Sequence, residues 1–399
     1  MDYRKKILVT TSTFPNFLKN DSTPPFVYEL SKRLSKKYDL KIIVSTPYIR
    51  NSKELEEKDN MKIYRYKYGF SALRDGAMLP NIKKNKFLIL QIPFLLLFSF
   101  LNIIKIVKKE HISIIHAHWI FPQCFLAVFY KKLFRKKNLK IICTIHGSDI
   151  FELKNRFFVK IKKWTLNNSE VITVVSKEIK NEVYKIGIKK TPTILAPMGV
   201  DELFFNPDKC DINIRKKYGI NSPLFLFVGR LVEKKGLKYT FLAMKLVLKK
   251  YPDAKLLIAG VGPQKNELKN LSKNLGIEKN IIFLGGISNQ ELPSYYTTAD
   301  LFLSSTLSEG FGLVFVEAML CKCPVISSDL KAISDVVKNG KTGIQVDVKN
   351  TQLYTDKILE LMKNNRKRKQ LVENGYKFAK ENFIWDISVE KYYNLIKNL

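Results

Sequence analysis

The feature that most constrains the fold of this chain is a repeated alternation of short apolar segments with longer amphipathic ones. The first half has segments of high β-propensity at residues 7–10, 40–45, 63–66, 112–117, 141–145 and 171–175. The second half has them at residues 224–228, 255–259, 281–284, 301–304, 324–327 and 343–346. Helical patterns separate most of these segments. Strands that alternate with helices form a parallel sheet with both faces covered, so we expect an α/β protein.

A stretch marked by proline and glycine separates the two series of strands. It comprises residues 195–201, followed by Asn206 and Pro207. A chain of 399 residues is long enough for two α/β domains of ordinary size. We therefore predict a first domain at residues 1–197, a second at 198–380 and a closing helical segment at 381–399.

The charge of the chain is strongly unbalanced. Lys and Arg number 69 against 36 Asp and Glu, which gives a formal net charge of +33. A charge of this size favours anionic partners such as phospholipid, lipid phosphates or nucleic acid. A solvated, lysine-rich surface is the alternative explanation.

Five cysteines occur, at positions 124, 143, 210, 321 and 323. The number is odd and the spacing gives no disulfide framework, which fits a reducing cytoplasm. Cys321 and Cys323 have no neighbouring residues that would complete a metal site. The apolar run near the N-terminus, residues 7–9, is too short for a signal peptide and fits a first core strand.

Residues 87–107 form an apolar segment of nearly the length of a membrane span. Polar residues and a proline interrupt it, namely Gln91, Pro93, Ser99 and Asn102. Lysines flank it, namely Lys83, Lys84, Lys86, Lys105, Lys108 and Lys109. Three readings stay open: a buried helix, an element lying on an anionic membrane surface, and a true span, which would split an otherwise continuous domain.

The most informative motif for function is residues 309–317, which have a glutamate at each end and Gly-Phe-Gly near the start. Residues 299–305 read as a buried strand that runs into a polar turn, and residues 318–320 read as helix. The free N–H groups of a helix start can hold an anion. A carboxylate within the helix can accept hydrogen bonds from ribose hydroxyls. The motif is therefore typical of a site for a nucleotide sugar.

A second motif supplies fixed positive charge. A predicted strand ends at Gly229, Arg230 and Lys235 follow, and Gly236 opens the next helix. Two cations beside a helix start can neutralise a diphosphate leaving group.

Together these motifs resemble the retaining glycosyltransferases of family 4. The matching segments are residues 115–119, 144–149, 197–201, 229–236, 259–263, 283–285 and 309–317. The resemblance implies the GT-B architecture, in which two Rossmann-like domains face each other across a cleft. It also implies that the first domain binds the acceptor, the second binds the nucleotide sugar, and the C-terminal helix packs back toward the first domain.

The resemblance assigns roles to residues of the second domain. Glu317 would bind the ribose hydroxyls and Glu309 would approach the donor sugar. Sugar and phosphate would be held by backbone amides, those of Phe311, Gly312 and Leu313.

Four further residues acquire roles in the same way. Arg230 and Lys235 would bind the diphosphate. His146 would contact the donor sugar from the first domain, and Leu284 lies in the region that flanks the base.

The residues themselves allow other readings. His146 could be a packed core histidine. His116 and His118 point the same way on a strand and, with His146, could form a metal triad, although packing near the cleft fits them better. Asp149 could bind substrate or cap a helix. Gly262, before Pro263, could contact the nucleotide or start a helix.

The chain departs from the family pattern at three places. Residues 11–25, the loop after the first strand, contain no glycine, which puts phosphate or acceptor contact there in doubt. Cys124 stands where relatives often have glycine. No Asp-x-Asp pair occurs, so we predict no metal and no cofactor, with a nucleoside diphosphate sugar as donor substrate.

The expected activity is retaining transfer of a sugar to a membrane-associated glycan or lipid-linked acceptor in cell-surface polysaccharide biosynthesis. The enzyme would work in the cytoplasm, on the inner face of an anionic membrane. Two other classes stay open: a sugar-nucleotide epimerase or phosphorylase of the same fold, and a binder of anionic polymers. No nucleic-acid-binding module is recognisable, so nucleic acid is not an expected partner.

Overall fold

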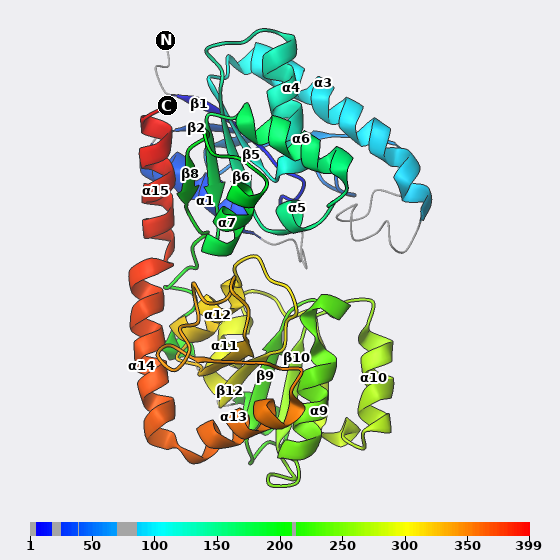
Figure 1. Ribbon diagram of the computed structural model, residues 1–399, viewed down its shortest axis with the longest axis vertical. Helices are drawn as coiled ribbons and strands as arrows, with labels where there is room; N and C mark the ends of the chain where they lie inside the picture. The colour runs from blue at the N-terminus through cyan, green and yellow to red at the C-terminus, as the bar shows by residue number, and fades with distance from the viewer. Residues whose placement is uncertain (1–4, 18–24, 39, 70–85, 210–212) are drawn as a thin grey trace. The chain divides into compact units, whose positions relative to one another are not determined.

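The protein, seen here as a computed structural model, consists of two compact α/β units (Figure 1). The structure describes residues 5–17, 25–38, 40–69, 86–209 and 213–399. One unit comprises residues 1–198 together with Ser388–Leu399, and the other comprises Gly199–Ile387. The domain boundaries predicted from the sequence lie between residues 197 and 198 and between residues 380 and 381.

The first unit is built on an eight-stranded sheet with the order β3-β4-β2-β1-β5-β6-β7-β8. All neighbours pair in parallel except β3 and β4, which are antiparallel. The strands are β1 (Lys6–Thr10), β2 (Lys41–Pro47), β3 (Leu55–Lys58), β4 (Met61–Tyr66), β5 (Ile114–His118), β6 (Lys140–Ile145), β7 (Val171–Val174) and β8 (Thr193–Leu195). The central strands are buried along nearly their whole length, which is why they read as continuous apolar runs.

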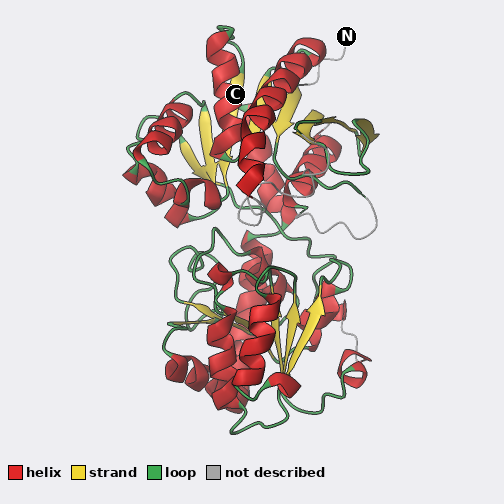
Figure 2. Ribbon diagram, turned by 90° about the vertical axis from the view of Figure 1, so that its right-hand side faces the viewer, coloured by secondary structure: helices red, strands yellow, loops and turns green. Residues whose placement is uncertain are grey.

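Helices lie on both sides of this sheet (Figure 2). They are α1 (Phe26–Tyr38), α3 (Ile92–Glu110), α4 (Phe125–Leu133), α5 (Ser148–Phe151), α6 (Arg156–Asn167) and α7 (Lys177–Lys185), with the short turns η2 (Lys86–Gln91) and η3 (Ile120–Cys124). α6 and α7 each begin at a side-chain cap, Asn155 and Ser176.

The last helix of the chain, α15 (Trp385–Lys397), completes the first unit. The Tyr392 hydroxyl donates to the carbonyl oxygen of Ala196 at 3.1 Å. The Lys5 ammonium group donates to the carbonyl oxygen of Ile396 at 3.1 Å. The two ends of the chain are therefore tied together within one unit.

The second unit has a six-stranded parallel sheet with the order β11-β10-β9-β12-β13-β14. Its strands are β9 (Leu224–Val228), β10 (Lys255–Ala259), β11 (Ile281–Gly285), β12 (Leu301–Ser304), β13 (Val325–Ser328) and β14 (Ile344–Val346). Numbered within the unit, this is the order 3-2-1-4-5-6 of a Rossmann fold, which reverses between β9 and β12.

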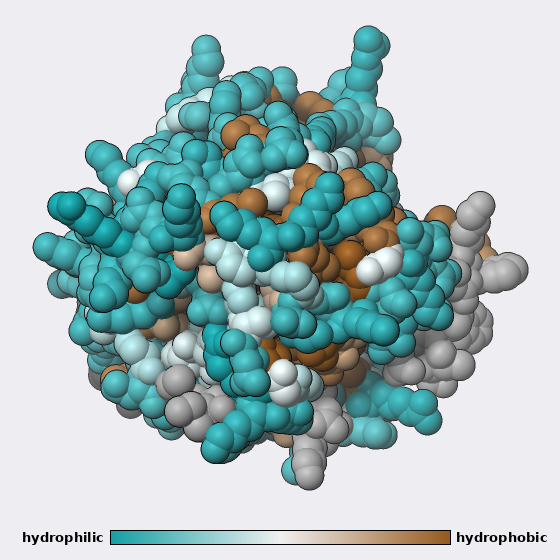
Figure 3. Space-filling model, turned by 90° about the horizontal axis from the view of Figure 1, so that it is seen from below, coloured by the Kyte–Doolittle hydropathy of each residue, from teal (hydrophilic) through white to brown (hydrophobic). Residues whose placement is uncertain are grey.

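The helices of the second unit alternate with its strands, and three 3-10 turns accompany them. The helices are α8 (Asn213–Lys217), α9 (Leu237–Val247), α10 (Lys265–Asn274), α11 (Leu292–Thr298), α12 (Leu313–Leu320), α13 (Thr351–Lys363) and α14 (Asn365–Asn382). The turns are η4 (Pro207–Lys209), η5 (Glu233–Lys235) and η6 (Glu278–Asn280). Figure 3, a view from below Figure 1, shows a mostly hydrophilic surface, as the lysine content predicts.

The structure bears on three segments or residue types discussed in the sequence: residues 87–107, the cysteines, and the loop after the first strand. The segment at 87–107 becomes η2 and α3, and within the described residues one helix, Ile89–Glu110, is long and apolar enough to cross a membrane. Four cysteines are buried and unpaired, while Cys210 lies outside the described residues. Residues 18–24 of the glycine-free loop, and the flanking Lys83 and Lys84, also lie outside them.

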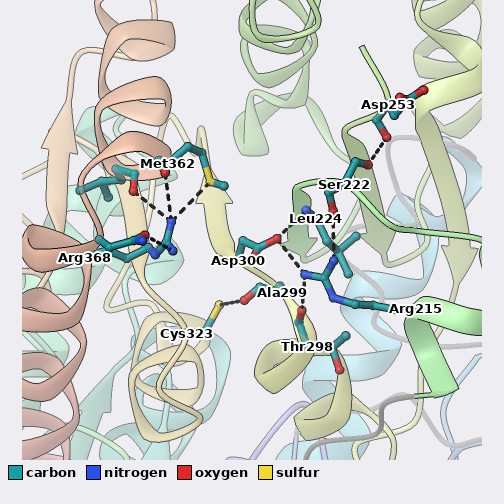
Figure 4. A network of polar contacts seen from close by, with 12 residues as sticks. Arg215, Ser222, Leu224, Asp253, Thr298, Ala299, Asp300, Cys323, Met362 and Arg368 are labelled. Atoms are coloured by element: carbon teal, nitrogen blue, oxygen red, sulfur yellow. Dashed lines mark hydrogen bonds and ion pairs between the residues drawn. The ribbon is translucent and has the colours of Figure 1, made fainter. Parts of the chain in front are cut away.

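A polar network closes the end of the second sheet at which β9 and β12 begin (Figure 4). Arg215 of α8 pairs with the Asp300 carboxylate at 2.8 Å and donates to the carbonyl oxygens of Ser222 and Thr298. Asp300 also accepts from the backbone N–H of Leu224 at 2.8 Å. One carboxylate thus fixes the starts of both strands that meet at the reversal.

The Asp300→Ala variant should therefore lose about 1–2 kcal/mol of unfolding free energy, because it leaves the Leu224 N–H without its acceptor and the Arg215 guanidinium without its charged partner. Urea unfolding at neutral pH measures this loss. Asp253→Ala, at an exposed position near the same network, is the matched control and should change stability by less than about 0.5 kcal/mol. Equal effects of the two substitutions would contradict the role given to Asp300.

Candidate functional site

Two loops meet where the strand order of the second sheet reverses. Residues 229–236 follow β9, and residues 305–312 follow β12. The backbone N–H of Leu307 donates to the carbonyl oxygen of Lys234 at 2.7 Å, and the Ser305 hydroxyl donates to that of Gly236 at 2.8 Å. In open parallel sheets, ligands bind outside the carboxyl ends of the strands at such a reversal. The motifs singled out in the sequence come together at this edge.

An ion pair joins the two loops. The Lys235 Nζ atom lies 2.5 Å from the Glu309 Oε2 atom, and both side chains are about one-fifth exposed, at 19%. Burial alone would raise the pKa of Glu309, but the attraction of Lys235 and the hydrogen bond from the Gly310 N–H outweigh burial and hold that pKa below its ordinary value. Glu309 is therefore ionised at neutral pH.

Glu317 occupies a different environment, on α12, whereas Glu309 lies in the loop before that helix. Its Oε2 atom accepts a hydrogen bond of 2.9 Å from the Tyr296 hydroxyl of α11. Burial raises the pKa of Glu317 to about 7, and the hydrogen bond from Tyr296 offsets only part of this rise. The residue keeps some surface accessible to solvent. The two carboxylates of one motif thus have pKa values shifted in opposite directions.

The start of α12 lies between the two carboxylates. Gly312 precedes the helix with φ of 89°, a left-handed conformation that L-residues rarely adopt. A Cβ atom on Gly312 would lie 2.4 Å from the Phe315 ring. Leu313 begins the helix, so its N–H and that of Val314 have no acceptor in a preceding helical turn, whereas the Phe315 N–H donates to the carbonyl oxygen of Gly312 at 3.0 Å. Only glycine therefore fits at this position, between Phe315 and the Glu309 side chain.

The other predicted residues of this unit lie near the same edge. Phe311 is buried, and its ring packs edge-on against Phe383 at 5.3 Å. The Arg230 side chain is exposed, and within residues 213–399 no hydrogen bond or ion pair holds it. Leu284 is half-buried on the outer strand β11.

Gly262 has a packing role whatever else it does. A Cβ atom there would lie 2.3 Å from the carbonyl oxygen of Leu231, so only glycine fits between the loops after β9 and β10. The helix α10 begins three residues later, at Lys265. Contact of Gly262 with a nucleotide stays a prediction.

His146 belongs to a separate cluster in the first unit. It follows β6, and its Nε2 atom lies 3.0 Å from the Nδ1 atom of His118 on β5. Its ring packs against Trp119 at 4.8 Å and against Phe26 at 5.0 Å. Burial lowers the pKa of His146 to about 3, so the ring is neutral. Neutral imidazole can donate one hydrogen bond and accept another.

The hydrogen bonding of His118 selects the tautomer of His146. His118 is fully buried. Burial is the main cause that holds its pKa well below the ordinary value, and the nearby histidines add to this lowering. Its Nε2 atom has no hydrogen-bond partner among the described residues. A buried donor without an acceptor costs about 1–3 kcal/mol, so the proton of His118 belongs on Nδ1 and is donated to His146. His146 then carries its own proton on Nδ1 and can donate from there.

His116 is held on the other side of this cluster. Its Nε2 atom lies 2.7 Å from the Thr144 hydroxyl, which in turn lies 2.6 Å from the Thr173 hydroxyl. Burial lowers the pKa of His116 to about 3. Within the described part of the chain, no group of three His, Cys, Asp or Glu side chains has a geometry that could hold a metal ion. The hydrogen bonds account for His116 as a packed, satisfied side chain.

Asp149 binds backbone. Its carboxylate accepts from the N–H groups of His146, Gly147 and Ile120 at 3.2, 2.9 and 3.1 Å. Burial raises the pKa of Asp149 to about 6 although these hydrogen bonds act against the rise. The residue therefore ties the turn that carries His146 to the turn after β5, which is close to the capping role considered for it.

Sequence reasoning missed two partners in these clusters. Tyr296 is fully buried and hydrogen-bonds Glu317, and His118 orients His146. A carboxylate two turns inside an apolar helix signals that some buried donor must face it. Nothing in the sequence indicates which residue supplies that donor, since Tyr296 lies on another helix.

The Glu317→Gln variant should change the pH dependence of stability. Between its ordinary value of 4.5 and about 7, Glu317 is ionised in the unfolded chain and protonated in the folded one, so wild-type stability falls as pH rises through this window. Because the residue is partly accessible, we expect a relative gain of about 1–2 kcal/mol for the variant at pH 8 compared with pH 5. Chemical unfolding at both pH values measures it. The exposed Glu278→Gln should show no such trend, and a pH-independent difference at Glu317 would refute the shift.

Comparison with known proteins adds a family likeness. The model described as Glycosyltransferase Family 4 matches residues 25–202, and the model described as Glycosyl transferases group 1 matches residues 211–378. An uncharacterized glycosyltransferase of Methanocaldococcus jannaschii, MJ1178, is 33% identical over 290 residues, which cover 71% of this chain and 74% of that protein.

Two relatives with stated activities are also similar. N-acetyl-alpha-D-glucosaminyl L-malate synthase of Bacillus anthracis is 28% identical over 72% of this chain and 75% of its own. GDP-mannose-dependent alpha-(1-6)-phosphatidylinositol monomannoside mannosyltransferase of Mycolicibacterium smegmatis is 28% identical over 55% of this chain and 60% of its own.

Solved structures share the fold. Sucrose-phosphate synthase of Thermosynechococcus elongatus superposes with a TM-score of 0.82 at 20% identity, over 99% of both chains. Alr3699/HepE of Anabaena, crystallised in complex with UDP, superposes with a TM-score of 0.78 at 17% identity, over 99% of this chain and 100% of that one. Both comparisons agree with a fold of two Rossmann-like units.

Proposed function

This chain belongs to the GT-B glycosyltransferases of the family 4, group 1 type, and we propose that it transfers a sugar from a nucleoside diphosphate sugar with retention of the anomeric configuration. The observation that carries the proposal is the Lys235–Glu309 pair beside the open start of α12, at the reversal of the second sheet. The similar Anabaena protein supports a nucleotide donor, since it was crystallised in complex with UDP.

The diphosphate of the donor would bind at the cationic side of this edge. Lys235 is fixed by Glu309, the exposed Arg230 lies on the same loop, and α12 begins at Leu313, four residues after Glu309. As the bond to the sugar breaks, negative charge grows on the departing diphosphate while the sugar becomes oxocarbenium-like. Preorganised positive groups stabilise that charge more in the transition state than in the bound substrate. We propose no metal ion or cofactor in this step.

Glu309 would have two roles in this arrangement. Its ionised carboxylate holds Lys235 in place before the donor arrives. It also lies beside the helix start, where a donor sugar attached to the diphosphate would come. We propose that it positions the sugar, and that the leaving phosphate takes the proton of the acceptor hydroxyl.

Glu317 would bind the ribose. Glu317 lies on α12, the helix whose start we propose to bind the phosphates. The Tyr296 hydroxyl of α11 holds the Glu317 carboxylate in place. An ionised carboxylate can accept from two ribose hydroxyls at once. Such donors favour the ionised form of Glu317, so nucleotide binding would lower its raised pKa. The contact of His146 with the donor sugar stays a prediction, because that residue belongs to the other unit.

The acceptor would be a membrane-associated glycan or lipid-linked sugar, met by a peripheral enzyme on the cytoplasmic face. The mycobacterial relative, a mannosyltransferase of phosphatidylinositol monomannoside, supports a lipid acceptor. The net charge of +33 supports work at an anionic surface. Synthesis of cell-surface polysaccharide is the process that would use such an activity.

A nucleotide panel tests the donor site. UDP, GDP and ADP are each added to the purified protein, and the thermal midpoint is followed. The matching nucleotide at 100 times its dissociation constant should add about 2.7 kcal/mol of stability. Glu317→Ala should abolish this gain, while the exposed Glu278→Ala should keep it. If no nucleotide stabilises the wild type, the proposed donor site is refuted.

The Lys235→Gln variant tests charge stabilisation. We expect turnover of the preferred donor, measured as release of nucleoside diphosphate, to fall by about 10²–10³-fold. Lys234→Gln is the matched control, because Lys234 is the exposed neighbour on the same turn. A loss of turnover that is equal in the two variants would show that only general positive charge matters.

A further inference from the structure

Helix α3 presents a continuous apolar stripe to solvent. Leu90, just before the helix, is 69% exposed, and Phe94, Leu97, Phe98 and Leu101 are between 40% and 51% exposed. Their spacing places them on one helical face. Exposed side chains of this size rarely gather on a soluble protein without a partner.

The opposite face of α3 is fixed to the first unit. Ile103, Ile106 and Val107 are buried there. The Asn102 amide donates to the Ser45 hydroxyl of β2 at 2.8 Å, and Glu110 accepts from the Tyr64 hydroxyl of β4 at 2.7 Å. A helix tied in this way to the central sheet does not leave it to cross a bilayer. It can only lie along a surface.

Aromatic contacts extend the stripe onto two more helices. The Phe100 ring of α3 lies 5.3 Å from Phe129 of α4, and Phe125 of α4 lies 5.7 Å from Trp164 of α6. Phe125 and Phe129 stack on each other. α3, α4 and α6 lie together in Figure 1. We define the aromatic face as the exposed apolar residues of this region, namely Leu90, Phe94, Leu97, Phe98, Leu101, Phe129, Leu133, Phe134, Phe157 and Trp164.

Basic side chains accompany the aromatic face. Lys105 continues the stripe one turn beyond Leu101, and the Lys108 ammonium group lies 5.9 Å from the centre of the Phe134 ring. Other exposed basic residues on these helices and their connections are Lys109, Lys132, Arg135, Lys136, Lys137, Lys160 and Lys163. The nearby acids are largely neutralised: Glu110 pairs with Lys62, and Glu170 pairs with Lys131. The face is therefore apolar with a cationic surround.

We infer that the aromatic face docks the protein on the surface of an anionic phospholipid bilayer. Apolar side chains would enter the boundary between headgroups and acyl chains, while the lysines would extend to the phosphates. A second copy of the chain fits less well, because pairing two such faces would bring their like charges together. The inference rests on the proposed function, since docking would bring the enzyme to a lipid-linked acceptor.

Flotation with vesicles tests this docking. The protein is mixed with vesicles of phosphatidylcholine, either alone or with phosphatidylglycerol, and the floated fraction is measured. We expect at least about tenfold stronger binding to the anionic vesicles, weakened by added salt.

The double variant Leu97→Ser with Leu101→Ser should reduce binding to anionic vesicles by at least about tenfold, because two exposed apolar side chains no longer enter the bilayer. The matched control is Leu203→Ser with Leu353→Ser, which removes two exposed leucines from the second unit. The control should bind as the wild type does. Circular dichroism and thermal midpoints show whether all variants are folded.

The double variant Lys105→Gln with Lys108→Gln measures how much the positive charge, as distinct from the apolar side chains, contributes to vesicle binding. This pair should reduce binding several-fold and flatten its salt dependence. The control pair, Lys269→Gln with Lys273→Gln, lies on α10 of the second unit, has the same change in net charge and should retain binding.

The inference would be overturned if the wild-type protein did not bind anionic vesicles. It would also be overturned if the Leu97→Ser, Leu101→Ser variant bound them as the wild type does. A wild-type dimer that becomes monomeric in the leucine variant without any vesicle binding would overturn it too, since the face would then belong to a second copy. Nucleotide stabilisation is measured on the same samples without vesicles. Normal nucleotide binding with failed flotation removes only the docking surface, and the reverse result removes only the donor site.

Discussion

The ion pair between Lys235 and Glu309 is the interaction on which the candidate site depends. It joins loops that are far apart in sequence and that meet only because the strand order reverses between β9 and β12. It sets the charge of Glu309, holds an ammonium group beside the open start of α12, and is backed by hydrogen bonds between the same loops. Charges this well buried persist only when paired. Glu309 therefore keeps Lys235 charged and in place before any ligand binds.

The sheets were largely predictable, because strands buried on both faces leave continuous apolar runs such as residues 224–228 and 141–145. β3 was missed for the opposite reason: Leu55–Lys58 is an exposed edge strand made mostly of charged residues, and only its pairing with β4 makes it a strand. The motif around Glu309 and Glu317 was readable because glycine and carboxylates at fixed spacing carry local information. The roles of Tyr296 and His118 were not, since each depends on packing between segments that the sequence does not connect.

Helix α3 is a case in which hydropathy alone does not distinguish a core helix, a surface helix and a membrane span. The sequence established that residues 87–107 are apolar and flanked by lysine, but a core helix, a surface helix and a span all share that pattern. Asn102 donates a hydrogen bond to the sheet, Glu110 accepts one from it, and the other side of the helix has an exposed stripe; these observations distinguish the cases. The apparent interruptions of the segment turn out to include contacts that anchor it. Polar residues in such a segment therefore mark the side that faces the protein.

The return of α15 to the first unit has a consequence for the synthesis of the chain. The second unit is a continuous stretch, whereas the first needs Ser388–Leu399, whose Tyr392 and Ile396 bond to Ala196 and Lys5. A ribosome makes the chain from its N-terminus, and domains generally fold as units during synthesis. Here the unit that begins first along the chain cannot be completed until residues 388–399 have been translated, and the unit between its two parts can be finished before it. Until α15 has left the ribosome, the part of the first sheet that Tyr392 covers, beside His116 of β5 and Thr173 of β7, stays without its partner.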